Sequence, residues 1–443
     1  MKINFFWFRR DLRLEDNTGL YQALKEGHPV LPVFIFDRDI LEKLNDKDDA
    51  RVTFIFDTII DLKSQINKQG SDLIICFGEP KQIWEELTNR YQVNGVFANA
   101  DYDHYSLERD KKIESHLNAR DIPFIVFKDH VIFEKDEIVK PDGKPYTVFT
   151  PYKNKWMEKL RSERDVTGDS IYLTPVPSNQ YLDGFFKTSI IDKPISLEQM
   201  GFVRSDIPIP TKNVTQNLIL KYHETRDFPA INGTSKLGIH FRFGTISIRE
   251  KARKAAAMNQ TYLNELIWRD FYNMILYQFP HVQKGAFRPE YDLIPWRNDE
   301  SDYNKWKEGK TGYPIVDAGM RELARTGYMH NRVRMIVASF LTKHLLIDWR
   351  WGEAWFAQKL LDYDLASNNG GWQWAAGCGT DAAPYFRIFS PDAQTKKFDP
   401  DHIYIKRWVP EFGTINYQKP IVDHQFARER CLRVFKEALS RGN

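Results

Sequence analysis

The first 130 residues alternate between short apolar runs and segments of helix length, and this rhythm constrains the fold more than any other feature. The apolar runs cover residues 3–8, 30–36, 71–78, 96–98 and 123–127. Helix-length segments, such as residues 49–69 and 81–91, lie between them. This order predicts a doubly wound, Rossmann-like parallel sheet with helices on both faces. No GxGxxG motif opens it, so a conventional dinucleotide site is not expected there.

The remainder of the chain follows a different pattern. From about residue 200 the apolar spacing is helical, with helices expected at residues 263–279, 313–325, 329–346 and 353–361. Residues 131–200 show neither rhythm and contain turn clusters at 140–145 and 175–179. With 443 residues, two domains are expected. We predict an α/β domain over residues 1–130, an interdomain linker over residues 131–200 and an all-α domain over residues 201–443.

Composition narrows the class of protein. The sequence has no apolar run long enough to cross a bilayer, and its start lacks the apolar core of a signal peptide. Three widely spaced cysteines (Cys76, Cys378 and Cys431) favour a reducing, cytoplasmic compartment and argue against a disulfide framework or a metal site. A net charge of +3 is too small to indicate a nucleic-acid partner. The 12 tryptophans suggest stacking or redox chemistry, although large cores also use tryptophan.

One stretch, residues 362–374, concentrates acids, amides, glycines and indoles. Asp362 and Asp364 are followed by Asn368 and Asn369, then by two glycines, and then by Trp372 and Trp374. Glycines allow close approach of a bulky group, and the other side chains offer hydrogen bonds and flat stacking surfaces. We therefore predict a pocket for a large polar heteroaromatic ligand. The alternative is a glycine turn between two helices with chance aromatics.

Two further helices carry polar side chains on one face. Residues Glu265, Trp268, Arg269 and Tyr272 have i, i+3, i+4, i+7 spacing. They indicate either an acid beside a stacking platform or an amphipathic surface with an ion pair.

The second of these faces lies on the helix expected to begin near residue 329. Asn331, Arg334, Met335 and Ala338 share it, and Arg334 could pair with Asp362. Arg332 could reach a phosphate. Residues 234–238 (TSKLG) suit a phosphate cradle, although a simple helix cap explains them equally well.

Several motifs in a fixed order resemble the DNA photolyase/cryptochrome family. They are WFRRDLRLEDN (residues 7–17), TSKLG (234–238), NELIWRDFY (264–272), KTGYPIVDAGMREL (310–323), MHNRVRM (329–335) and NNGGWQWAAGCGTDAAPYFRIFSP (368–391). The similarity continues to YQKPIVDHQFARER (417–430), so it covers essentially the whole chain. Within the family, the chain looks most like the microbial class I cyclobutane pyrimidine dimer photolyases.

The resemblance implies that the helical domain binds FAD, which is active in its reduced form. The matching positions are Tyr222, Thr234, Ser235, Lys236, Leu237, Gly238, Arg269, Arg334, Asp362, Tyr363, Asp364 and Asn368, of which Asn368 would face flavin N5. Tyr262 and Gly238 depart from the residues common in close relatives, tryptophan and serine. The folate motif is not matched near Tyr105, so the antenna chromophore is expected to be a deazaflavin or absent.

The resemblance also implies light-driven electron transfer from reduced FAD to a pyrimidine dimer in UV-damaged DNA. The catalytic positions are Glu265, Trp268, Asn331, Met335 and Trp374; Arg226 and Arg332, with the two lesion-pocket tryptophans, would contact DNA; and Trp372, Trp349 and Trp296 would carry electrons to the flavin. Glu265 would hydrogen-bond a pyrimidine carbonyl and would need a proton for it. The protein is expected to be a monomer without a membrane partner.

Three alternatives remain at this point. A cryptochrome-type light receptor would bind flavin with little repair. A (6–4) photoproduct photolyase would carry histidines where this chain has Asn331 and Met335. A non-photochemical nucleotide-binding module would leave the matched tryptophans unexplained.

Overall fold

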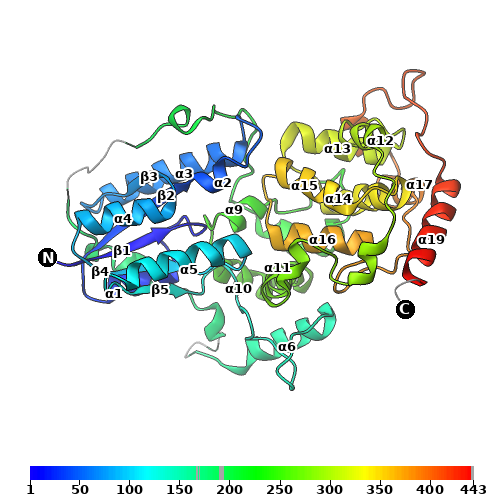
Figure 1. Ribbon diagram of the computed structural model, residues 1–443. Coiled ribbons are helices and arrows are strands. Elements are labelled where there is room, and N and C mark those ends of the chain that lie inside the picture. Colours follow the sequence, from blue (N-terminus) through cyan, green and yellow to red (C-terminus); the bar gives the residue numbers. More distant parts are fainter. Residues whose placement is uncertain (166–167, 169, 189–193, 441–443) are drawn as a thin grey trace. The chain divides into compact units, whose positions relative to one another are not determined.

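The computed structural model describes residues 1–165, 168, 170–188 and 194–440 (Figure 1). The chain divides into two compact units. The first comprises Met1–Ile138, Lys155–Lys212 and Leu237–Ala257, and the second comprises Val139–Asn154, Asn213–Lys236 and Met258–Asn443. Parts of the predicted linker (166–167, 169 and 189–193) and the last three residues of the predicted helical domain lie outside the described residues. The predicted domain boundaries at residues 130 and 200 stay predictions.

The first unit is built on a parallel sheet of five strands. They are β1 (Ile3–Phe8), β2 (Val30–Asp37), β3 (Ile74–Gly78), β4 (Val93–Asn99) and β5 (Phe124–Phe127), in the order β3-β2-β1-β4-β5. Phe6 of the central strand pairs with Pro32 on one side and with Phe97 on the other. All six residues of β1 are buried. The predicted doubly wound, Rossmann-like sheet is confirmed.

Helices cover both faces of this sheet, as the alternation of side chains along β1 requires. Phe6 and Phe8 pack in one buried cluster with residues of α1 (Thr18–Lys25) and α3 (Ala50–Asn67). Phe5 and Trp7 pack in a second cluster with residues of α4 (Pro80–Arg90) and α5 (His104–Asn118). The continuous apolar character of the strand therefore reflects burial on two sides.

Shorter elements complete the first unit. They are α2 (Arg38–Leu41), the greater part of α6 (Phe149–Ser162), the single turns η1 (Ile171–Leu173), η2 (Ser178–Gln180), η3 (Leu182–Gly184) and η4 (Glu198–Met200), α9 (Gly238–Arg242), and α10 (Ile248–Met258).

The second unit consists of helices and their connections in its described residues, as predicted, with one isolated bridge between Val139 and Pro145 (Figure 1, green to red). Its elements are α7 (Gln216–Leu220), α8 (Tyr222–Thr225), α11 (Gln260–Gln278), η5 (Pro280–Gln283), η6 (Pro289–Leu293), α12 (Glu300–Lys307), α13 (Pro314–Thr326), α14 (Asn331–Ser339), η7 (Phe340–His344), α15 (Trp349–Lys359), α16 (Leu365–Ala376), α17 (Pro391–Phe398), α18 (Ile403–Trp408) and α19 (His424–Ser440). None of the helices in the described part of the chain combines the length and apolar character that crossing a membrane requires.

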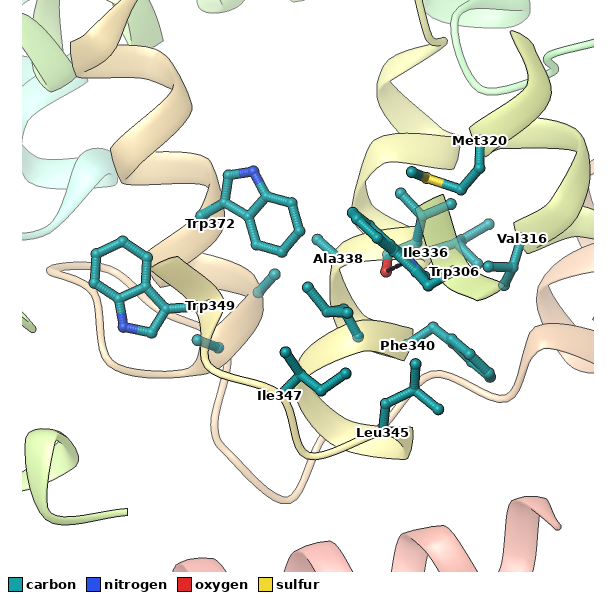
Figure 2. Close-up of a cluster of buried hydrophobic side chains, with 14 of the residues drawn as sticks. Trp306, Val316, Met320, Ile336, Ala338, Phe340, Leu345, Ile347, Trp349 and Trp372 are labelled. Atoms are coloured by element: carbon teal, nitrogen blue, oxygen red, sulfur yellow. Dashed lines mark hydrogen bonds between the residues drawn. The ribbon is translucent and has the colours of Figure 1, made fainter. Parts of the chain in front are cut away.

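The core of this unit is rich in aromatic side chains. Figure 2 shows Trp306, Phe340, Trp349 and Trp372 within one buried cluster. The single helix expected over residues 329–346 is instead α14 followed by the π-helical turn η7. Such turns change the direction in which side chains project, which simple periodicity does not anticipate.

A buried ionic network ties the segment after β1 to α10 within the first unit. Asp129 is completely buried and accepts hydrogen bonds from Arg13 (Nη2, 2.7 Å), from Arg249 (Nη2, 2.9 Å) and from the backbone N–H of Thr18 (3.1 Å). Arg249 also binds Asp16, with 2.9 Å between its Nε and Oδ1. Burial acts to raise the pKa of Asp129, but the two guanidinium groups lower it to below its usual value.

We expect the substitution Asp129→Ala to lower the free energy of unfolding by about 3–5 kcal/mol, because it removes the buried carboxylate that Arg13 and Arg249 share and leaves Arg249 with Asp16 alone. Denaturant unfolding measures the loss. Asp57→Ala is the control, since the Asp57–Arg204 pair is about half exposed (52% and 54%) and its removal is expected to cost less than about 1 kcal/mol. Equal losses in the two variants would show that the Asp129 network does not stabilise this unit.

Candidate functional site

The second unit contains a cavity of about 410 Å³, a size typical of ligand pockets. Most of its walls come from α11, α14 and α16, with contributions from α15 and the segment that follows it. The lining residues are Arg226, Glu265, Trp268, Arg269, Tyr272, Asn331, Arg334, Met335, Ala338, Phe356, Leu360, Asp362, Tyr363, Asp364, Ser367, Asn368, Gly371, Trp372 and Trp374. The three segments that the sequence singled out therefore meet around one space.

Helix α11 presents to the cavity the face that its periodicity predicts. Glu265, Trp268, Arg269 and Tyr272 all line it. The helix begins at an Asn259 cap whose side chain accepts a hydrogen bond from the N–H of Tyr262 (3.1 Å).

The ring of Trp268 is held by Phe149. The two rings are stacked with their centroids 3.6 Å apart and an interplanar angle of 6°. Tyr272 lies at 5.3 Å from the same indole. Because Phe149 covers one face of Trp268, only the other face and the edges of the indole remain for a ligand. The platform is thus fixed before anything binds, which reduces the entropy lost on binding.

Glu265 forms an ion pair with Arg226, through Oε1 and Nη1. Its side chain keeps 30% of its accessible surface because it faces the open cavity, although protein surrounds it. This burial raises the pKa of the Glu265 carboxyl above its usual value, while Arg226 acts in the opposite direction. The site therefore holds a carboxyl group that gains a proton more readily than an exposed glutamate.

Helix α14 presents the second predicted face, since Asn331, Arg334, Met335 and Ala338 all line the cavity. His330 caps this helix, and its Nδ1 accepts a hydrogen bond from the N–H of Arg332 (3.2 Å). Burial lowers the pKa of His330 to about 4, so it is neutral at physiological pH. His330 therefore acts here as the cap of α14.

Arg334 and Asp362 form the ion pair that the sequence suggested. Arg334 Nη2 lies 2.9 Å from Oδ2 and 3.1 Å from Oδ1 of Asp362. The Nε of the same guanidinium donates to the carbonyl oxygen of Met329 (2.7 Å), which fixes its plane. Both charges line the cavity, so the pair offers a polar edge to a ligand.

The segment over residues 365–376 is the helix α16, which excludes the glycine turn considered from sequence. Asp364 caps it by accepting from the N–H of Ser367 (3.2 Å). A carbon atom added at Gly371 would meet no atom within 4 Å, so this glycine opens onto the cavity. One added at Gly370 would lie 2.3 Å from the ring of Tyr272, so this glycine permits close packing against α11.

Asn368 has a defined orientation. Its Nδ2 donates to Glu353 Oε1 (2.9 Å) and to the Glu353 carbonyl oxygen (3.1 Å). Both partners are acceptors, so the amide nitrogen must face them and the amide oxygen is turned away. Burial raises the pKa of Glu353, and the hydrogen bond from Asn368 opposes that effect.

Helix α16 is anchored beneath the cavity by Gln373. Its Nε2 donates to the carbonyl oxygens of Val282 (3.0 Å) and Gly285 (3.2 Å), and its Oε1 accepts from the N–H of Phe287 (2.8 Å). The side chain thereby satisfies the backbone of the segment that follows α11. This anchor sets the depth of the cavity residues on the same helix, among them Asn368, Gly371 and Trp374.

The three tryptophans expected to carry electrons differ in burial. Trp372 lines the cavity and is 2% exposed, and Trp349 is 3% exposed in the same buried cluster (Figure 2). Trp296 is partly buried against this cluster, with its ring 5.8 Å from that of Phe435. Trp372 and Trp349 are thus buried and Trp296 is partly buried, and the role of the three as an electron-transfer chain remains a prediction.

Other predicted positions lie outside the cavity lining. The phosphate-cradle residues form contacts of their own: Ser235 accepts from the hydroxyl of Tyr262 (3.2 Å), which packs on Tyr222, and Thr234 lies 3.0 Å from the hydroxyl of Tyr328. Lys236 has a left-handed backbone (φ 53°) and its ammonium lies over Tyr328. Leu237 and Gly238 belong to the first unit.

Arg332 is also absent from the lining. It pairs with Asp227, with 2.6 Å between Nη2 and Oδ1, and its guanidinium lies over the ring of Phe398 at 4.3 Å.

Six lining residues were not among the predicted site residues: Tyr272, Ala338, Phe356, Leu360, Ser367 and Gly371. Tyr272 and Ala338 were already on the predicted faces. Ser367 and Gly371 follow Asp364 at helical spacing and could have been found in the same way. Phe356 and Leu360 carry no such signal, because apolar residues at this spacing are normally core.

Comparisons with known proteins give a consistent result. A family model described as DNA photolyase matches residues 4–175, and one described as the FAD binding domain of DNA photolyase matches residues 262–416. A deoxyribodipyrimidine photo-lyase of Halobacterium salinarum is 36% identical over 98% of this chain and 99% of its own length. That of Alkalihalophilus pseudofirmus is also 36% identical, over 97% of both chains.

Solved structures are similar over almost the whole chain. A bacterial class III photolyase from Agrobacterium tumefaciens has a TM-score of 0.86 at 31% identity, covering 99% of this chain and 98% of the other. An archaeal photolyase from Sulfolobus tokodaii, solved with two FAD molecules, has a TM-score of 0.81 at 34% identity, covering 98% and 99%. A Synechocystis cryptochrome, at 23% identity, covering 98% and 99%, and with a TM-score of 0.82, shares the fold.

We expect Gly352→Ala to destabilise the second unit by about 1–3 kcal/mol, because its methyl group would lie 2.1 Å from the rigid ring of Trp372. Gly371→Ala is the matched control on the neighbouring helix. Its methyl group enters open space, so the gain in helix propensity should stabilise by up to about 1 kcal/mol. Denaturant unfolding of both variants measures the difference, and a stable Gly352→Ala protein would contradict the packing described for Trp372.

Proposed function

Because this chain belongs to the DNA photolyase family, we propose that it is a deoxyribodipyrimidine photo-lyase, which uses light to split cyclobutane pyrimidine dimers in UV-damaged DNA. The observation that supports this most is the composition of the cavity. Glu265, Trp268 and Asn331 line it together with the Arg334–Asp362 pair. A stacking platform, a proton-accepting carboxyl and a polar edge for a heteroaromatic cofactor thus share one space.

The residues present fit FAD. The polar edge of a flavin ring needs hydrogen-bonding groups of both signs, which Arg334, Asp362 and the Asn368 amide oxygen provide. Gly371 leaves open space on α16, and Phe356 contributes apolar surface. We propose that these groups hold the ring, with Arg269, Tyr363 and Asp364 beside it, and that Tyr222 and residues 234–236 hold the remainder. The cofactor contacts expected for Leu237 and Gly238 stay predictions. When bound, reduced FAD supplies the electron, on excitation by light, that opens the cyclobutane ring.

The lesion would enter by leaving the base stack. Photolyases are among the enzymes that are expected to flip their target out of the duplex. A damaged, poorly stacked dinucleotide costs less free energy to extrude than an intact one. We propose that the free face of Trp268 and the indole of Trp374 stack on the pyrimidine pair, with Asn331 and Met335 completing the wall. Stacking of this kind contributes about 1–3 kcal/mol per base.

Glu265 is proposed to donate a hydrogen bond to a pyrimidine carbonyl. Donors directed at developing negative charge are a large catalytic term. Only a protonated carboxyl can donate, and the raised pKa of Glu265 supports that state.

Arg226 and Arg332 are proposed to bind DNA phosphates, which adds affinity without sequence preference. We also propose that the protein is a monomer and that it meets its DNA substrate in a reducing, cytoplasmic compartment. The antenna, a deazaflavin or none, and the class I assignment remain predictions, the latter because a class III photolyase is among the similar structures.

A repair assay tests the proposal directly. Reduced, flavin-loaded protein is mixed with an oligonucleotide carrying one thymine dimer, and intact strand is counted after blue light or darkness. We expect restoration in light alone. Trp268→Ala should weaken binding of this DNA by about 1–3 kcal/mol, roughly 5- to 150-fold in Kd, with little effect on undamaged DNA. Bound, photoreducible FAD without any restoration would instead favour a cryptochrome-type receptor.

We expect Trp296→Phe to block photoreduction of oxidised flavin while leaving repair by chemically reduced protein intact. The half-buried position of Trp296 suits the last donor of a chain that begins at buried Trp372. Flavin absorbance under illumination with an external reductant measures the rate. Trp408→Phe is the control, since Trp408 is also partly buried in this unit but lies outside the proposed chain. Normal photoreduction in the Trp296 variant would refute this assignment.

A further inference from the structure

Arg226 faces two demands in the same molecule. Its guanidinium is paired with Glu265 inside the cavity, and its Nε lies 4.0 Å from the carboxylate of Asp227. The proposed function also assigns Arg226 to a DNA phosphate. A phosphate is a stronger acceptor for a guanidinium than a single carboxylate contact, since it accepts two parallel hydrogen bonds. Binding of DNA therefore competes with the Arg226–Glu265 ion pair.

Arg332 provides an internal comparison. It too is assigned to DNA, but its partner is Asp227, whose side chain is 39% exposed and is absent from the cavity lining. If a phosphate displaces Asp227, that carboxylate remains in contact with water. If a phosphate displaces Glu265, this carboxylate is left in a cavity that the lesion then fills. Displacement of Arg332 therefore leaves a hydrated carboxylate, whereas displacement of Arg226 leaves a carboxylate that the bound lesion buries.

We propose that Arg226 and Glu265 form a proton switch operated by DNA: a phosphate draws Arg226 away, and Glu265 takes up a proton from solvent and donates it in a hydrogen bond to the lesion. The inference rests on the proposed function and adds a regulation of its site. In the free protein, the ion pair keeps Glu265 charged, and water in the open cavity hydrates it. In the complex, the neutral acid avoids the cost of burying an unpaired carboxylate.

The electrostatic surroundings of Glu265 support this direction. Burial already raises its pKa, Arg226 is the group that lowers it, and Asp227 raises it further. The other titratable groups that interact with it are the phenols of Tyr222, Tyr262 and Tyr272, all of which have raised pKa values because of burial.

These phenols remain neutral and add no positive charge. Of the remaining charged side chains around the cavity, Arg334 is neutralised by Asp362, and Arg269 and Asp364 balance in sign. Loss of the Arg226 contact and the drying of the cavity by a bound lesion both raise the pKa of Glu265 in the complex.

The pH dependence follows from linkage. The pKa of Glu265 is higher in the complex than in the free protein, so binding takes up a proton at pH values between the two. Affinity for dimer-containing DNA rises as pH falls through this window. Below the lower pKa and above the higher pKa, Glu265 has the same state in both forms and affinity no longer changes.

Proton uptake can be measured by calorimetry of the flavin-loaded protein, titrated with a duplex carrying one thymine dimer in buffers of different ionisation enthalpy. We expect uptake approaching one proton per complex within the window, and an infrared band of a protonated carboxylic acid in the complex that Glu265→Gln removes. Glu265→Gln should also abolish the uptake.

Arg226→Gln and Arg332→Gln form a matched pair. Both should lower affinity and reduce the salt dependence of binding by about one unit of slope, since each removes one phosphate contact. Only Arg226→Gln should reduce proton uptake and narrow its pH window, because Glu265 has then lost its partner in the free protein as well and only the drying of the cavity still raises its pKa on binding. Arg226→Lys, which keeps the charge, should retain more of the uptake than Arg226→Gln.

Tight, dimer-specific binding and light-dependent repair without proton uptake would overturn the switch and leave the proposed function intact. Equal loss of uptake in Arg226→Gln and Arg332→Gln would also overturn it. A protein that neither distinguishes dimer-containing DNA nor repairs it would overturn the proposed function itself.

Discussion

The anchoring of α16 by Gln373 is the constraint on which the rest of the site depends. The amide of Gln373 satisfies three backbone groups between Val282 and Phe287, all buried or half-buried. A buried polar group without a partner is costly, so this helix cannot slide or rotate without exposing several at once. Asn368, Gly371 and Trp374 are thereby held at fixed depths along the cavity wall. A ligand consequently meets a preformed surface, which lowers the entropy lost on binding.

The sequence predicted the architecture and the cavity-lining faces well, for a physical reason. Strand and helix have different side-chain periods, so the faces of α11 and α14 could be assigned before any tertiary contact was known. The Arg334–Asp362 pair followed from opposite charges on two such segments. Phe149 beneath Trp268 could not be predicted, because that contact joins two segments that no local pattern relates. The π-helical turn after α14 was missed for a similar reason, since it depends on packing.

One residue of the hydrophobic core also lines the cavity. Trp372 lines the cavity and packs against Phe356 and Trp306 at ring distances of 5.0 and 6.1 Å. Gly352 makes this possible, because any larger residue there would meet the indole. One side chain thus belongs to both the core and the site. A change in core packing is transmitted to the cavity wall, because close-packed interiors have low compressibility and transmit strain.

The two ion pairs in the cavity differ in how firmly they are held, and the difference accounts for their separate roles. Arg334 is fixed by Met329 as well as by both oxygens of Asp362, so three contacts must break before it can move. Arg226 contacts Glu265 through a single nitrogen, and its second acid lies at 4.0 Å. A competing anion can therefore detach Arg226 while Arg334 stays in place. A permanent pair suits the recognition of a cofactor that stays bound, whereas a weakly held pair suits a substrate that arrives and leaves. In the switch that we propose, occupancy of the DNA site sets the charge state of Glu265, and the acid becomes a donor only when there is a lesion to receive its hydrogen bond.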